Sequence, residues 1–351
     1  MREILRTFLS VCAAAVALSC TTQTSYVTIT GFAQGGTYTV KYNQNGLQCS
    51  PEEVKDSVDA ILGRIDRSLS GYNKKSLLSR FNAGETIMPD VLFKEIYALA
   101  YDVFGQTSGA VDVAAAPLYD IWGFGFANDS LPSQDRVLEV LNSCGMHRLK
   151  HNMSDALSAD GILSPEALLA VHGALPKLNY NAIAQGYSCD VVARYLYSIG
   201  VKDMLVDIGE IFCDGVNPSG KPWTLAIDRP ADGNNQPGAQ VQGIFRTPEG
   251  PHGIVTSGNY RKFYVRDGKK YAHTVDPRTG YPVEHTLLSA TIVADDATMA
   301  DAYATYCMVI GLEASREFIS SRPDLEACLI YDDAGIFRTW TSEGFILESL
   351  D

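Results

Sequence analysis

The sequence is that of an acidic, globular protein. It has 351 residues, of which 46% are hydrophobic and 20% are charged, so it can form a substantial core and is not globally disordered. Lysine and arginine total 28 against 41 aspartates and glutamates, a net charge of −13, and no basic run is longer than a pair. These values argue against nucleic-acid binding. An anionic ligand would need a metal ion or backbone amides to hold it.

The N-terminal residues predict export. Leu9–Leu18 is an apolar run of roughly half the ~20 residues that a membrane-spanning helix needs. We interpret residues 1–19 as a signal peptide. Val16–Cys20 resembles a bacterial lipobox, which predicts lipidation of Cys20 and a polar tether over 20–25. Ordinary signal-peptide cleavage is the alternative. We expect an exported protein that a lipid anchors to the membrane on the periplasmic side.

Helical spacing and capping signals mark the first half of the remaining chain. Ser50–Glu53 is a capping box with proline at the first helical position, and apolar residues at helical spacing follow as far as Gly71. The same spacing predicts three more helices, at about 90–104, 133–142 and 184–199.

Strand-like runs and turns dominate the second half. The runs 261–266 and 269–273 flank Asp267-Gly268, which is a strong hairpin signal, and 326–331 pairs with 336–341 in a second hairpin. Further strands are predicted at 205–208, 223–227 and 288–293, and helices at 299–310 and 313–320. Helices and strands do not alternate strictly, so the sequence predicts an α+β fold of helices and antiparallel-rich sheets, not a doubly wound sheet.

Several common catalytic signatures are absent from the sequence. It has no G-x-S-x-G, no H-E-x-x-H and no G-x-G-x-x-G after a strand. Its eight cysteines include no C-x-x-C pair, which argues against a zinc ribbon or a thioredoxin-like site. Cys189, Cys307 and Cys328 lie in apolar patterns and are expected to be buried.

Two pairs of polar residues have spacing that suits catalysis. Asp301 and Thr305 are four apart on a predicted helix, so both oxygens project from one face and form a hard-oxygen pair suited to Mg²⁺. A helix-start Asp with a backbone-bonded Thr is the alternative. His273 ends a strand and Asp276 enters a turn, which would suit a general base with carboxylate help, or equally a capped turn.

Two further segments are rich in small and polar residues. In Asn179–Tyr187, Gly186 opens an apolar helix and would let a ligand approach the backbone at the helix N-terminus, although any capped helix start looks similar. Thr256–Tyr260 is expected to be a turn of small residues with spare donors, or simply a loop.

Together with export, these segments resemble the ApbE family, the FAD:protein FMN transferases. The resemblance spans nearly the whole mature chain. In the family's order it includes Gly35–Tyr38, Ser70–Ser76, Gly109–Val113, Pro117–Gly125, Asp207–Glu210, Thr256–Gly258, His273–Gly280 and Ala300–Thr305. It implies one ApbE-like, T-fold-related domain over residues 26–351.

The resemblance also implies the site residues. Mg²⁺ would be held by Asp301, Thr305 and the backbone carbonyl of Ala182. His273, oriented by Asp276, would take the proton of the acceptor hydroxyl. Contacts to FAD are implied for Gln34, Tyr72, Ala110, Val111, Asp112, Asn179, Gln185 and Ser257. Tyr72 and the segment of Trp122 could line the flavin pocket, although Trp122 fits a core position more simply.

The sequence departs from the commonest family pattern at four positions. Gln34 stands where methionine is frequent, Asn179 replaces Asp, and Gln185 replaces Lys or Glu, which removes charge near the ligand and keeps hydrogen bonding. Ala304 stands where some relatives have a second Asp, which leaves fewer anionic ligands for the metal.

The implied function is Mg²⁺-dependent transfer of FMN from FAD to a threonine or serine hydroxyl of an extracytoplasmic protein, with release of AMP. The implied acceptors are threonine-bearing subunits of membrane electron-transport complexes, of the sodium-translocating NADH:quinone reductase or Rnf type. A Mg²⁺-dependent FAD pyrophosphatase that forms FMN and AMP, and a non-catalytic FAD-binding lipoprotein, are the alternatives.

Overall fold

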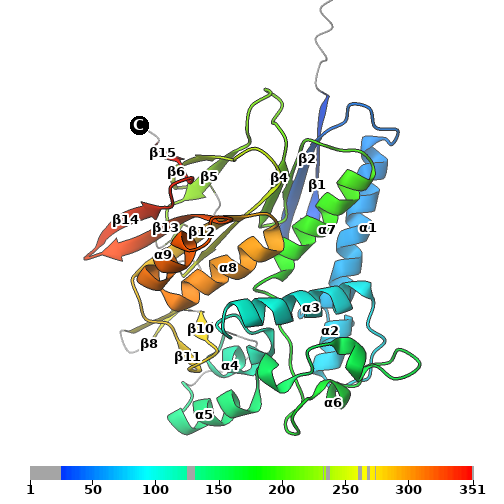
Figure 1. Cartoon of the computed structure of the whole chain (residues 1–351), viewed down its shortest axis with the longest axis vertical. Coiled ribbons are helices and arrows are strands. Elements are labelled where there is room, and N and C mark those ends of the chain that lie inside the picture. The colour runs from blue at the N-terminus through cyan, green and yellow to red at the C-terminus, as the bar shows by residue number, and fades with distance from the viewer. Residues whose placement is uncertain are drawn as a thin grey trace, which may run out of the picture.

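An eight-stranded sheet is the frame of the structure, which is a computed structural model (Figure 1). The structure describes residues 25–124, 131–231, 233–234, 238–259, 263–266, 269–272 and 274–349. The sheet order is β1-β2-β3-β4-β7-β12-β13-β14, and each pair of neighbours is antiparallel. These strands are β1 (Tyr26–Ala33), β2 (Gly36–Asn43), β3 (Met204–Asp207), β4 (Ile211–Asp214), β7 (His252–Gly258), β12 (Leu287–Ala294), β13 (Glu326–Asp333) and β14 (Ile336–Thr341).

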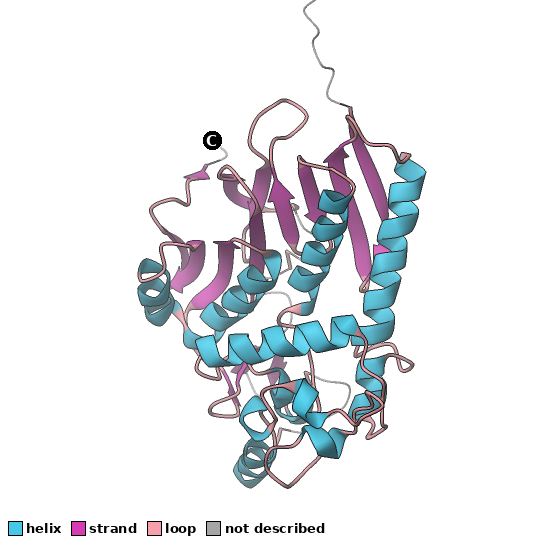
Figure 2. Cartoon of the chain, turned by 45° about the vertical axis from the view of Figure 1, so that its right-hand side comes forward, coloured by secondary structure: helices cyan, strands magenta, loops and turns pink. Residues whose placement is uncertain are grey.

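Helices pack on one face of this sheet, as Figure 2 shows. They are α1 (Pro51–Leu69), α7 (Ala184–Ser198), α8 (Ala297–Ile310) and α9 (Leu312–Ser320). One core cluster joins α1 and α7 to β2 and β3, and a second joins α8 and α9 to β7, β12 and β13. The opposite face is covered by a smaller sheet of β15 (Leu347–Glu348), β6 (Val241–Arg246) and β5 (Thr224–Asp228), through a cluster that includes Trp223 and Phe345.

A second group of helices lies beyond one end of the sheet. In Figure 1, α3 (Val91–Gln106) crosses near the ends of α1 and α7, with the shorter helices below it. The shorter helices are α2 (Leu77–Asn82), α4 (Ala116–Ile121), α5 (Gln134–Ser143) and α6 (Pro165–Leu168), and the 3-10 turn η1 (Val113–Ala115) precedes α4. Two small hairpins complete the described part, β8 (Phe263–Arg266) with β9 (Lys269–Ala272), and β10 (Val275–Asp276) with β11 (Tyr281–Pro282).

Helix α1 illustrates how local signals and burial act together. The Ser50 hydroxyl accepts the Glu53 N–H at 3.2 Å, and the Glu53 carboxylate accepts the Ser50 N–H at 2.8 Å, which forms the predicted capping box. Its apolar face, including Val58 and Leu62, is buried in the core. Burial of each such side chain is worth about 1.5–3 kcal/mol, so packing on the sheet outweighs the cap.

The structure confirms the α+β prediction and corrects one of its elements. The predicted helices and strands are all present, with ends shifted by a few residues, and β8 pairs with β9 as the hairpin signal indicated. Thr256–Gly258, however, is the end of strand β7 and not a turn. The reason is its pairing with β12, in which Ser257 faces Ala290, because the pairing with a neighbouring strand can hold small polar residues in an extended conformation.

Some predictions concern residues that the structure leaves out. The signal peptide, Cys20, Gly125, Tyr260, Asp267-Gly268 and His273 lie outside the described residues. Within the described ranges, no helix has the length and apolar composition needed to cross a bilayer. The six cysteines there are unpaired, and Cys189, Cys307 and Cys328 are buried as expected.

Candidate active site

Helices α7 and α8 approach each other most closely at Gly186. A Cβ at this position would lie 2.1 Å from the carbonyl oxygen of Ala297, so only glycine fits. Glycine is therefore required here by the backbone of α8. The sequence analysis expected Gly186 to give a ligand access to the backbone, and the structure shows α8 in that place instead. The N–H of Gly186 donates to the Asp301 carboxylate at 3.1 Å. This contact holds Asp301 at the N-terminal end of α7.

Asp301 is a buried carboxylate. Its side chain is 4% exposed, and burial raises its pKa to about 7, although the Gly186 N–H lowers it. A buried carboxylate is costly without a compensating positive charge. Thr305 lies one helical turn further on the same helix and is half-buried. The structure thus places the predicted pair on one helix, as the spacing of four indicated.

The third predicted metal ligand is free to act as one. In a regular first turn, the Gly186 N–H would bond to the carbonyl of Ala182, but it bonds to Asp301 instead. From within the described ranges, no hydrogen bond reaches the Ala182 carbonyl. A carboxylate, a hydroxyl and a backbone carbonyl are the hard oxygen donors that Mg²⁺ prefers, so these residues fit the ion. The described residues contain no group of three or more His, Cys, Asp or Glu side chains that could bind a metal.

The position of α8 is set by a residue that sequence analysis missed. Asp190 on α7 accepts the N–H of Ala297 at 2.9 Å and the N–H of Thr298 at 2.8 Å, which caps the start of α8. Burial raises the pKa of Asp190 to about 6. Its neighbours Val191 and Val192 belong to an apolar helical pattern, and nothing in that pattern signals a cap 107 residues away. The only sequence signal was an acidic residue within an apolar helix.

The predicted flavin contacts Ala110, Val111 and Asp112 form a buried segment between α3 and η1. Asp112 accepts the N–H of Ala114 at 2.8 Å and that of Met146 at 3.1 Å. Burial raises the pKa of Asp112 to about 6, although these backbone bonds lower it.

The segment that opens α7 lies beside this buried segment. The N–H of Asn179 donates to the Val113 carbonyl at 2.7 Å, next to Asp112. The structure therefore brings Asn179 to the Ala110–Asp112 group.

Three other predicted contacts lie around α7 and α8. Gln34, at φ 53° in the turn between β1 and β2, donates to the hydroxyl of Ser188 on α7. Gln185 donates to the carbonyl of Ile208 at 3.3 Å. Val255 packs with α8, and the two-residue period of β7 places Ser257 on the same face of the sheet.

Tyr72 is the predicted contact that comes from the segment after α1. It is 65% exposed in the loop between α1 and α2. Asn82 of α2 links this region to the site. Its side-chain amide donates to the carbonyl of Leu178 and accepts from the N–H of Leu178, each at 2.8 Å. Leu178 directly precedes Asn179.

Asp276 ends strand β10 and is held by Arg278. Its two carboxylate oxygens accept from Nε and Nη2 of Arg278, each at 2.9 Å. This pair is a charge-assisted, bidentate hydrogen bond. Orientation of His273 by Asp276 remains a prediction, since His273 lies outside the described residues. Arg278 is a further residue that the sequence analysis did not single out.

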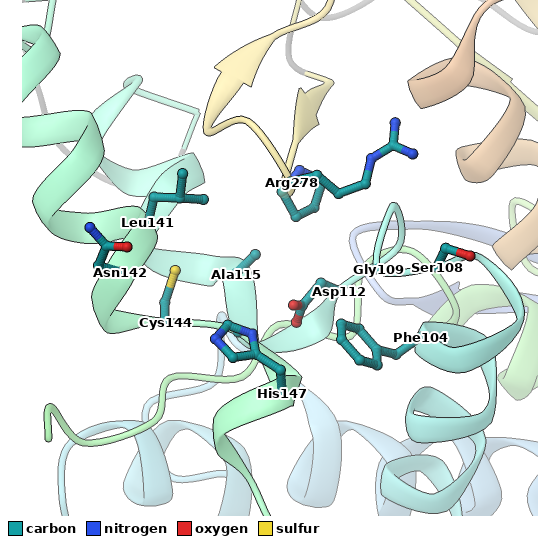
Figure 3. Close-up of a pocket in the computed structure, with 12 residues that line it drawn as sticks. Phe104, Ser108, Gly109, Asp112, Ala115, Leu141, Asn142, Cys144, His147 and Arg278 are labelled. Atoms are coloured by element: carbon teal, nitrogen blue, oxygen red, sulfur yellow. The ribbon is translucent and has the colours of Figure 1, made fainter. Parts of the chain in front are cut away.

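A pocket and a groove are both lined by Arg278, in the turn that follows Asp276. A half-open pocket of about 340 Å³ lies between the α5 region, η1 and Arg278, and Figure 3 shows Asp112 and Arg278 among the residues that line it. An open groove of about 790 Å³ lies on the other side of Arg278, along α8 and α9. The groove is lined by Asp276, Arg278, Tyr306, Val309, Ile310, Ala314, Glu317, Phe318 and Ser321.

The fold and the site together define a class of protein. It is an α+β candidate enzyme with hard oxygen donors at a helix N-terminus and a half-open pocket nearby in the same site region. A model of the ApbE family matches residues 34–329 of this chain. The chain belongs to the ApbE family.

Relatives of known name match most of the chain. The FAD:protein FMN transferase of Escherichia coli K12 is 32% identical over 301 residues, which cover 84% of this chain and 81% of the relative. That of Haemophilus influenzae is 30% identical over 353 residues, with 98% of each protein covered.

Solved structures have the same fold. The flavin transferase ApbE from Vibrio cholerae has a TM-score of 0.73 and 29% identity over 91% of this chain and 98% of that one. The apo flavinyl transferase ApbE of Pseudomonas stutzeri has a TM-score of 0.76 and 31% identity over 92% and 96%. The likeness supports the ApbE-like α+β architecture predicted from the sequence.

Proposed function

We propose that this member of the ApbE family transfers FMN from FAD to a threonine or serine hydroxyl of an extracytoplasmic protein, in a Mg²⁺-dependent reaction that releases AMP. The chain is an enzyme of the FAD:protein FMN transferase type. Relatives of that name indicate this, because the chain matches 81% of the length of one and 98% of the length of the other. The observation that carries the proposal is the buried Asp301 carboxylate, which accepts the Gly186 N–H at the start of α7 and thereby leaves the Ala182 carbonyl unused.

The chain's own residues divide the work of binding and proton transfer. Asp301, Thr305 and the Ala182 carbonyl would hold the cation next to the FAD diphosphate. Magnesium, when bound, supplies positive charge that stabilises the diphosphate oxygens while the bridging phosphorus–oxygen bond breaks. Asp301 needs to be ionised for this role, and the Gly186 N–H favours its charged form.

The reaction forms one bond to phosphorus and breaks another. The acceptor hydroxyl oxygen attacks the FMN phosphorus, the bridging phosphorus–oxygen bond to AMP breaks, and AMP leaves with that oxygen. The hydroxyl proton passes to His273, which Asp276 would help to orient. The remaining residues position the two substrates, and positioning is the main source of catalysis in this type of transfer.

FAD would be held by residues from three parts of the chain. Ala110, Val111 and Asp112 offer a buried segment at the half-open pocket, which Asp112 lines, and this supports flavin binding there. Gln34, Tyr72, Asn179, Gln185 and Ser257 would make the other contacts to FAD. Gln185 and Asn179 are uncharged, so their contacts to the ligand would be hydrogen bonds.

The N-terminal pattern supports a location outside the cytoplasm. We infer that the protein is exported and lipid-anchored through Cys20 on the periplasmic side of the membrane. This location would bring it close to the threonine-bearing subunits of electron-transport complexes of the sodium-translocating NADH:quinone reductase or Rnf type, which we propose as acceptors.

Product analysis with and without an acceptor tests the proposal. The mature protein is incubated with FAD and Mg²⁺, with and without an acceptor domain that carries a flavinylation threonine, and AMP and FMN are separated by chromatography. The proposal predicts AMP release that depends on the acceptor and stops with EDTA, with little free FMN. Free FMN and AMP in equal amounts whether or not the acceptor is present would identify a pyrophosphatase. Bound FAD without AMP at any Mg²⁺ concentration would identify a storage protein.

A further inference from the structure

Trp122 joins two segments that are 158 residues apart in the sequence. Its indole N–H donates to the carbonyl oxygen of Gly280 at 2.7 Å. The side chain is 7% exposed and packs with Leu118, Val137 and Val275. A buried indole N–H needs an acceptor, and here that acceptor is the Gly280 carbonyl, so burial of Trp122 fixes the position of this carbonyl.

Gly280 closes the turn that follows Asp276. Its N–H donates to the Asp276 carbonyl at 2.8 Å, and its own carbonyl accepts from Trp122. The backbone has φ +80°, and a Cβ would lie 2.8 Å from Cγ1 of Val137 on α5. The Gly280 peptide is thus held on three sides, and Asp276 is connected to Trp122 through two consecutive hydrogen bonds.

The same turn contributes residues to both the pocket and the groove described above. Pro277 and Arg278 line the half-open pocket together with Asp112, as Figure 3 shows for Arg278 and Asp112. Asp276 and Arg278 also line the open groove, together with Tyr306, which directly follows the predicted metal ligand Thr305. The Asp276–Arg278 pair therefore lies between the pocket proposed for the flavin and the groove that is open to a protein acceptor. A movement of the turn would shift this pair relative to both.

We propose that Trp122 is a positioning residue for FMN transfer: its hydrogen bond to Gly280 holds the 276–280 turn, and with it the Asp276–Arg278 pair, where the acceptor hydroxyl is activated. The inference rests on the proposed function. Transfer to a hydroxyl depends on this geometry, whereas the proposed contacts to FAD, at Gln34, Tyr72, Ala110–Asp112, Asn179, Gln185 and Ser257, lie outside the 276–280 turn. Loss of the hydrogen bond should accordingly lower transfer and leave FAD affinity unchanged.

The test uses Trp122→Phe, which keeps an aromatic ring and removes the N–H donor. Trp223→Phe is the matched control, because Trp223 is also buried and its indole N–H also donates to a backbone carbonyl, that of Asp214 at 2.9 Å, in a different core cluster. Gly280→Ala is a second variant that displaces the same turn from the side of Val137. Acceptor flavinylation and free FMN are measured per FAD-binding site, so that partial unfolding does not imitate the effect.

We expect Trp122→Phe and Gly280→Ala to flavinylate the acceptor about 10- to 100-fold more slowly, since a displacement of ~1 Å can cost ~100-fold. In these two variants the ratio of transfer to hydrolysis should fall, and the dissociation constant of FAD should stay within about twofold of the wild-type value. The control Trp223→Phe should transfer FMN at the wild-type rate. Equal transfer rates in Trp122→Phe and Trp223→Phe would overturn the inference alone. Absence of transfer by the wild type would overturn the proposed function, and the inference with it.

Discussion

Asp112 is a carboxylate whose burial has a measurable energetic cost. Burial raises its pKa from 3.8 to about 6. Between these two values the unfolded chain ionises Asp112 while the native state keeps it protonated, so stability falls as the pH rises. Above pH 6 the cost amounts to about 3 kcal/mol, because one unit of pKa corresponds to about 1.4 kcal/mol.

Asp112→Asn tests this account. We expect the unfolding free energy of the wild type, relative to that of the variant, to fall by about 2 kcal/mol between pH 4 and pH 7, because part of the ~3 kcal/mol cost is already present at pH 4. Urea unfolding of both proteins at a series of pH values measures it. A difference that does not change with pH would show that Asp112 has an ordinary pKa in the native protein.

At the scale of residues, the sequence predicts what is local and misses what is distant. The spacing of four between Asp301 and Thr305 is sufficient to place both on one helix face. The cap that Asp190 gives to α8 spans 107 residues, and no local pattern encodes it. The same holds for Arg278, whose bond to Asp276 becomes visible only when the turn is formed.

At the scale of elements, the site depends on the distance between α7 and α8. Gly186 permits the backbone contact with Ala297, and its N–H holds Asp301. Gly186 thus acts on both the distance between the helices and the position of the carboxylate, together with the cap that Asp190 gives to α8. Packed helices seldom approach this closely unless a small residue lies at the contact.

Gly186→Ala should disturb both stability and metal binding. Its Cβ would clash with the Ala297 carbonyl, so we expect a loss of about 1–3 kcal/mol in unfolding free energy and a weaker response of turnover to Mg²⁺. Gly63→Ala in α1 is the control, because its nearest contact is the flexible end of Arg67 at 3.3 Å. That variant should be neutral or stabilised by up to about 1 kcal/mol. Similar stability losses in both variants would contradict the role given to Gly186.

The helices were more predictable than the strands, and α1 and β7 show why. Helix α1 has its own cap and a complete apolar face, so a short window of sequence contains its signal. Strand β7 lies between β4 and β12 in the centre of the sheet. β4 pairs only with its first residues, and the small residues Thr256–Gly258 become a strand through their pairing with β12. β1 and β2 likewise carry weak local signals and are paired along their whole length.

At the scale of the whole molecule, the order of the sheet explains how distant motifs meet. β3 and β4 connect the N-terminal hairpin of β1 and β2 to β7 and β12, so α7 and α8 become neighbours on one face. The Gln34 turn and the Asp301 helix thereby lie on either side of α7. The sequence predicts which segments belong to the site, but their arrangement follows from this topology.

The anchor should be separable from the enzyme. The first described strand begins at Tyr26, after the predicted tether. We therefore expect Cys20→Ser to move the protein from the membrane fraction to the soluble fraction, while the rate of FMN transfer per enzyme in solution stays the same. Fractionation followed by activity assay measures both. Retention of the variant in the membrane fraction would contradict lipidation at Cys20.

The central claim is that the Asp301 site drives transfer of FMN to a protein hydroxyl. Intact-mass spectrometry of an acceptor domain, incubated with FAD, Mg²⁺ and enzyme, tests it most directly. With the wild type, we expect the acceptor to gain the mass of one FMN less water, with one AMP released for each. Asp301→Ala should lower this rate by ~100-fold or more, because a metal ligand matters at least as much as its supporting residues. Asp324→Ala, at an exposed carboxylate paired with Arg322, should have no effect. Equal flavinylation by Asp301→Ala and the wild type would contradict the account.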